Sequence, residues 1–151
     1  MRAAVRIISL GLLGLSLAAC SGAGGIISQA AIPDANPAIV PAQRYFRMLS
    51  VGSATDAFAM LPSDDQSAPA QAYLQHAAAG LNGCYRSAAH FDAVPDSNSS
   101  TLYMVTVTLS PPCGRWEVGV AHPVSRCRFS VAEAEGQWKP SNRLLAISCT
   151  S

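Results

Sequence analysis

The spacing of apolar residues changes near the middle of the chain, and this change limits the fold more than any other feature. Before Cys84, apolar residues recur at helical spacings between proline and glycine breaks. After Cys84, they alternate with polar residues, as in half-buried strands. Helices followed by antiparallel strands predict an α+β fold, with N-terminal helices packed on a curved antiparallel sheet of about four or five strands.

Three helices are expected in the first half of the chain. The first covers residues 42–50, with Pro41 at its start, where the missing N–H of proline costs nothing. The second follows Ser53 as its cap, and the third covers residues 68–79 after a cap at Ser67. Their apolar sides are expected in the core: Tyr45, Phe46, Leu49, Ala57, Phe58, Leu61, Tyr73, Leu74, Ala77, Ala78 and Leu81.

Strands are expected in the second half of the chain. The predicted segments are residues 84–93, 101–109, 115–121, 125–132 and 138–149, the last bent near Pro140. The second segment alternates most clearly, with Val105 and Val107 on one face. Pro111, Pro112 and Pro123 are expected to end strands, because proline has no N–H to donate to a sheet.

Residues 1–19 have the three parts of a secretory signal peptide. Arg2 and Arg6 give a positive start, an apolar run covers residues 7–17, and small residues follow. The run is shorter than the ~20 apolar residues that span a bilayer. The cut site, Leu17-Ala18-Ala19-Cys20, resembles the lipobox of bacterial lipoproteins, in which an apolar residue and two small residues precede a cysteine.

This resemblance implies a lipid anchor. In such lipoproteins the cysteine thiol receives a diacylglycerol, a peptidase cuts just before the cysteine, and a further acyl chain such as palmitate is often added. Cleavage is therefore expected between Ala19 and Cys20, with lipid on Cys20. Several acyl chains hold a protein on a membrane where one does not. Ser21 in place of aspartate favours the outer membrane, facing the periplasm, if the organism has two membranes.

An ordinary secretory signal, cut for instance after Ala18, is the alternative. It would leave five cysteines in the mature chain, so one thiol would stay unpaired in an oxidising compartment. Lipidation of Cys20 leaves the even set Cys84, Cys113, Cys127 and Cys149. The cysteine count therefore favours the lipoprotein.

Residues 20–40 are expected to form a lipidated flexible tether, because they are rich in glycine, proline and alanine and show no sustained period. The pairs Ile26-Ile27 and Ile39-Val40 are apolar enough for part of the tether to pack on the domain or on lipid. Residues 41–151 then form one small disulfide-stapled α+β domain.

Two structural disulfides are expected among the four remaining cysteines. None of their spacings is that of the Cys-x-x-Cys pairs of zinc or thioredoxin-like sites, so no metal or cofactor is expected. The favoured pairing is Cys113–Cys127, which would clip a hairpin, with Cys84–Cys149, which would tie the first strand to the last. A Cys127–Cys149 pair across neighbouring strands stays open.

The order of helices and strands resembles the nuclear transport factor two-like and cystatin-like folds. Residues 135–139 resemble the turn and tryptophan that begin the last strand in many of these domains. The resemblance is architectural, covers about residues 41–149 and transfers no functional residue. Such folds serve enzymes, binding modules and scaffolds alike, so the fold does not select a function.

Two groups of residues are candidates for chemistry. His90 and Asp92 would share a strand face, and with His122 they could form an acid–base or metal site, although three histidines are also an ordinary content. The aromatic residues Trp116, Trp138, Tyr103 and Phe129 line either a pocket in the bent sheet or a packed core.

A second candidate is a partner-binding strip of arginines. Arg126 and Arg128 alternate with core residues, and Arg115 can join them across the turn at Pro123. The alternative is a solvated sheet face that Glu117 and Glu133 balance.

Charge excludes one broad class of function. Without Arg2 and Arg6 of the leader, eight of the ten basic residues remain against nine acidic ones, which argues against nucleic-acid binding. The sequence therefore favours a lipid-anchored envelope protein with a non-enzymatic binding or assembly module and an envelope protein as partner. A small pocket-based hydrolase or isomerase, and a structural subunit of a secretion or conjugation complex, are the alternatives.

The anchor and the disulfides predict one mass. The intact protein, extracted in detergent without reducing agent, should have the mass of residues 20–151 plus acyl chains, less four hydrogens for two disulfides. Mass spectrometry measures this directly. A mass without lipid would contradict the lipoprotein assignment.

Overall fold

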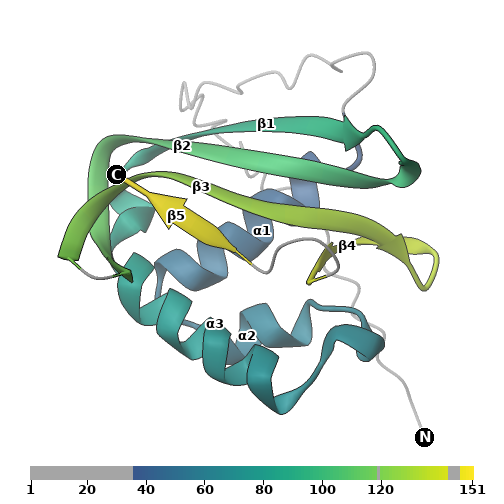
Figure 1. Cartoon of the computed structure of the whole chain (residues 1–151), viewed down its shortest axis with the longest axis horizontal. Coiled ribbons are helices and arrows are strands. Elements are labelled where there is room, and N and C mark those ends of the chain that lie inside the picture. Colours follow the sequence, from purple (N-terminus) through teal and green to yellow (C-terminus); the bar gives the residue numbers. More distant parts are fainter. Residues whose placement is uncertain (1–35, 119, 143–146) are drawn as a thin grey trace, which may run out of the picture. The chain divides into compact units, whose positions relative to one another are not determined.

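The computed structural model describes residues 36–118, 120–142 and 147–151, so the predicted signal peptide and most of the predicted tether lie outside the described residues. The elements are α1 (Ile39–Ser50), α2 (Ala54–Ala59), the 3-10 turn η1 (Ser63–Asp65), α3 (Ala68–Leu81), the 3-10 turn η2 (Cys84–Arg86), β1 (Ala88–Asp96), β2 (Ser99–Val118), β3 (Val120–Ala134), β4 (Gln137–Ser141) and β5 (Ser148–Thr150). Helices precede an antiparallel sheet and gather on one of its faces (Figure 1). The α+β prediction is confirmed.

Helix α1 begins earlier than predicted because a polar side chain completes its first turn. The Asn36 carboxamide oxygen accepts from the main-chain N–H of Ala38 (3.0 Å), and the Asn36 carbonyl accepts from that of Ile39 (3.0 Å). Ile39 and Val40, assigned from the sequence to the tether, are thus the first residues of the helix. The helix ends before Gly52, whose φ of +82° suits glycine.

The second and third helices begin where predicted. The Ser53 hydroxyl donates to the carboxylate of Asp56 in α2, and the Ser67 hydroxyl accepts from the N–H of Ala70 in α3 (3.3 Å). Helix α3 continues past Gly80, which was expected to lie beyond its end. The reason is packing: a Cβ on Gly80 would lie 2.7 Å from the carbonyl oxygen of Arg115, so glycine lets β2 approach the helix.

The sheet order is β1-β2-β3-β4, and β5 also pairs with β3, all antiparallel. Strands β2 and β3 are continuous, so the prediction that Pro111, Pro112 and Pro123 end strands is wrong. The register between the two strands shifts between Thr108 and Cys113 and again before Trp116. The prolines lie in this irregular stretch, where a ladder bond is already missing and their lack of an N–H costs little.

The first and last strands also differ from the prediction. Residues 84–86 form the turn η2, and β1 starts at Ala88. The predicted last strand is two strands, β4 and β5, which pair with different parts of β3.

The core lies between the helices and the inner face of the sheet. Tyr45 and Leu49 of α1 and Phe129 of β3 are fully buried, and the rings of Tyr45 and Phe129 lie 5.1 Å apart. Burial raises the pKa of Tyr45 well above its ordinary value. Of the aromatic residues considered for a pocket, Trp116 is also buried, whereas Trp138 is partly exposed and packs edge-on against Tyr103.

The disulfides join Cys84 to Cys113 and Cys127 to Cys149. The favoured pairing was wrong, and the open alternative for Cys127 is correct. The register explains why: Cys127 lies opposite Cys149 in the β3–β5 pair, whereas Cys113 lies opposite Val124. Cys84 lies in the 3-10 turn η2 after α3, not in a strand, and its bond to Cys113 joins this turn to β2.

Two glycines allow the close contact between α3 and β2 to be tested. Gly114 and Gly136 both have positive φ, so alanine strains the backbone at either position by about 1 kcal/mol. A Cβ on Gly114 would also lie 2.3 Å from the Gly80 oxygen, whereas none of the described atoms lies within 4 Å of a Cβ on Gly136. Gly114→Ala should therefore lower the free energy of unfolding by about 2 kcal/mol more than Gly136→Ala, as measured by urea denaturation of the oxidised protein. Equal losses would contradict a tight contact at Gly114.

Candidate functional site

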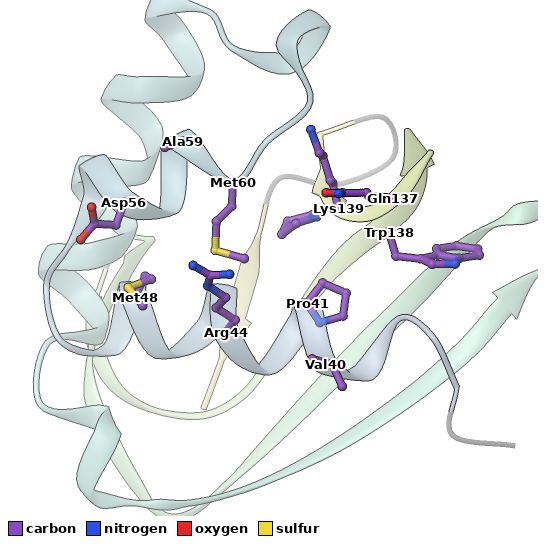
Figure 2. A pocket seen from close by; sticks show the side chains of 11 residues that line it. Val40, Pro41, Arg44, Met48, Asp56, Ala59, Met60, Gln137, Trp138 and Lys139 are labelled. Atoms are coloured by element: carbon purple, nitrogen blue, oxygen red, sulfur yellow. The ribbon is translucent and has the colours of Figure 1, made fainter. Parts of the chain in front are cut away.

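A groove runs between α1, α2 and β4. We call it the methionine groove, and its volume is about 860 Å³, within the range of ligand sites, which is roughly 300–1,000 Å³. Its lining residues are Val40, Pro41, Arg44, Met48, Asp56, Ala59, Met60, Gln137, Trp138, Lys139 and Pro140. Figure 2 shows these side chains around the space between the helices and β4.

The floor of the methionine groove is apolar and adaptable. Met48 and Met60 pack against the core but stay partly exposed, and Val40 at one end is 70% exposed. Methionine is flexible and polarisable, so it can fit apolar side chains of different shapes. The groove therefore offers an apolar surface that the domain itself does not cover.

One cation faces this floor without a carboxylate partner. Arg44 is exposed, and Figure 2 shows its guanidinium directed towards Met60. Within the described residues, no carboxylate lies within 4 Å of it. Asp56 instead accepts from Ser53, and Lys139 pairs with Glu135. Arg44 is thus available to an anionic group of a ligand.

Two carboxylates fix the β4 wall to the helical layer. Glu135 accepts from the main-chain N–H (3.1 Å) and the hydroxyl (2.7 Å) of Ser63, and it pairs with Lys139. Asp65 accepts from the Ser141 hydroxyl (2.9 Å) and the Asn142 N–H (3.0 Å). The groove is therefore largely formed before any ligand arrives.

The same contacts change the acidity of Glu135. The bond from Lys139, followed by those from Ser63, lowers the pKa of Glu135 from 4.5 to about 2. Because the folded-state pKa is depressed, these contacts contribute stability above pH ~4.5, and the contribution is lost as the pH falls towards 2.

The structure brings two of the three predicted arginines together. Arg126 and Arg128 lie on the exposed outer face of the sheet, where Thr108 and Thr106 of β2 are their cross-strand neighbours. No described carboxylate lies within 4 Å of either arginine. Glu133 does not neutralise the charge of these arginines, because its side chain lies on the opposite side of β3, the side to which Phe129 and Val131 also point.

Arg115 lies elsewhere. It is between Cys113 and Trp116, which pair with Val124 and His122 near the β2–β3 turn. It is exposed, and its main-chain oxygen packs against Gly80.

The histidines do not converge. His90 and Asp92 share the outer face of β1, as predicted, and form an exposed ion pair at 3.3 Å. His90 aligns with Arg126 across β2, and His122 lies four residues further along β3. Strand geometry puts the two histidines more than ~10 Å apart. In the described part of the chain, no group of three or more acidic, histidine or cysteine side chains could hold a metal ion.

Sequence reasoning missed most of the methionine groove. Only Trp138 was a candidate pocket residue, because the other lining residues come from separate elements and look like ordinary surface or core positions.

No protein-family model, curated protein or solved structure shows a significant match to the chain. Among the described helices, none is both long and apolar enough to cross a membrane.

The pKa of Glu135 tests the link between β4 and the helices. Lys139→Met removes the largest cause of the shift, so the pKa of Glu135 should rise from about 2 towards 4.5. An NMR titration of the Glu135 carboxyl carbon measures it. Arg44→Met, which removes another cation of the groove, should leave that pKa unchanged; an equal shift would point to a general charge effect.

Proposed function

We propose that this protein is a lipid-anchored protein of the cell envelope whose domain binds a segment of a partner protein in the methionine groove. Its role is binding or assembly rather than catalysis. The observation that carries the proposal is that Arg44, which has no carboxylate partner among the described residues, lies beside a partly exposed methionine floor.

The lipid anchor is supported by the leader and the cysteines. Leu17-Ala18-Ala19-Cys20 follows a positive start and a short apolar run. The other four cysteines pair completely, which is compatible with an oxidising compartment outside the cytoplasm. Lipid on Cys20 would leave no free thiol. We assign the mature protein to the envelope, and to the outer membrane facing the periplasm if the organism has two membranes.

The groove specifies the chemistry of the bound segment. Met48, Met60 and Pro41 favour apolar side chains, and Arg44 favours an acidic side chain among them. Burying such a segment would cover Val40, which is otherwise mostly exposed. An apolar segment with one carboxylate is therefore the expected ligand.

The groove also lies close to the anchor along the chain. Val40 at one end of the groove is about twenty residues after Cys20, so a fully extended chain could place it at most ~70 Å from the lipid. A partner in the same membrane or just above it would be within reach.

Site-specific photo-crosslinking in cells tests this function. A photoreactive amino acid at position 40 should capture a defined envelope protein, and Arg44→Glu should abolish that adduct because it turns the attraction for a carboxylate into repulsion. Mass spectrometry of the adduct identifies the partner.

Two matched controls accompany the experiment. The same amino acid at position 94 should not give that adduct, because Val94 is similarly exposed (62% against 70% for Val40) but lies on the outer face of β1. Arg47→Glu changes the charge of the same helix outside the methionine groove and should leave the adduct intact. An adduct that survives Arg44→Glu, or that forms equally from position 94, would contradict the proposal.

A further inference from the structure

In the part of the chain that the structure describes, strand β1 forms an open edge of the sheet. Among the described residues it pairs with β2 alone, in regular register from Ala88 to Pro95. The Asn36 side chain donates to the main-chain carbonyl of Ala93 (3.2 Å), which indicates that this carbonyl points away from β2. Alternation along the strand then puts the main-chain groups of Ala89 and Phe91 on the same open edge.

The side chains of the same two residues line a second groove. It has a volume of about 320 Å³ and lies between β1, α1 and the turn η2. Phe91 meets Phe46 of α1 edge-on, with ring centroids 6.0 Å apart, and Tyr85 beside them is 53% exposed. A strand added to β1 would therefore direct alternate side chains towards an apolar groove.

The charge of this second groove favours an acidic ligand. Arg47 lines it and has no carboxylate within 4 Å in the described part of the chain. Arg86 stacks on the ring of Tyr85 at 5.4 Å and likewise lacks a carboxylate partner there. Asp92, which follows Phe91 along β1, lies on the outer face and pairs with His90.

We propose that the open edge of β1 binds an extended acidic peptide as an added strand. Its main chain pairs with Ala89 and Phe91, an apolar side chain enters the groove beside Phe46, and a carboxylate two positions away binds Arg47. Side chains two positions apart on a strand point the same way, which gives the motif apolar-x-acidic. The proposal does not depend on the methionine groove, which lies beside β4.

A synthetic peptide tests the proposal on the full-length protein in detergent. The probe consists of threonines with one phenylalanine and, two positions later, one aspartate. Fluorescence anisotropy should show binding, and hydrogen exchange should show new protection of the Phe91 amide. A peptide N-methylated on the edge that faces β1 keeps its side chains but loses its donors, so it should not bind.

Protein variants separate main-chain pairing from charge. Arg47→Glu should weaken binding by about tenfold or more, whereas Arg126→Glu, an exposed arginine on the outer face of the sheet and outside both grooves, should not. Ala89→Pro removes an N–H on the open edge and leaves the pairing with β2 intact, so it should weaken binding without loss of near-ultraviolet circular dichroism.

Three results would overturn the proposal: no binding of the unmodified peptide at ~1 mM, equal binding of the methylated peptide, or equal effects of Arg126→Glu and Arg47→Glu. The crosslink expected from position 40 should be lost in Arg44→Glu and kept in Arg47→Glu, whereas peptide binding at β1 should be lost in Arg47→Glu, so failure of this proposal and failure of the proposed function are distinguishable.

Discussion

The rest of the domain depends on strand β3, because β2, β4 and β5 all pair with it. Its inward side chains Cys127, Phe129 and Val131 are fully buried, and Phe129 packs on Tyr45 of α1. One strand therefore sets the register of the sheet and positions the helical layer. The positions of both grooves depend on β3. Strand β4, a wall of the methionine groove, pairs with the end of β3, and β1, beside the second groove, is connected to β3 by pairing with β2.

The sequence was sufficient for features that depend on one element. Helical spacing predicted the burial of Tyr45 and Phe46, and strand alternation predicted that of Val105 and Val107. It was insufficient where two elements decide together. Whether a proline ends a strand depends on whether its partner also breaks the ladder there, and which cysteines bond depends on the register that brings Cys127 opposite Cys149.

The candidate sites likewise could be predicted where they lie on one element and could not where they combine several. Arg126 and Arg128 could be placed on one face from alternation, because both belong to β3. The grooves could not be predicted, because each collects residues from separate parts of the chain. Helix α1 contributes to both and gives one arginine to each, Arg44 beside β4 and Arg47 beside β1. Helix α1 thus contributes an arginine beside apolar residues to each of two surfaces. One is the methionine groove, and the other is the groove next to the edge of β1.

The disulfides carry a consequence for how the protein matures. The bonds Cys84–Cys113 and Cys127–Cys149 each join cysteines that are consecutive along the chain, so they close two separate rings rather than nested ones. An oxidase that joins cysteines in the order in which they leave a membrane channel would form the native pairs directly. With nested bonds, the first cysteine would have to stay reduced until its distant partner appeared, or a non-native disulfide would have to be exchanged later. The connectivity is therefore compatible with oxidation in the order of the sequence, as would occur if the chain crossed a membrane into an oxidising compartment.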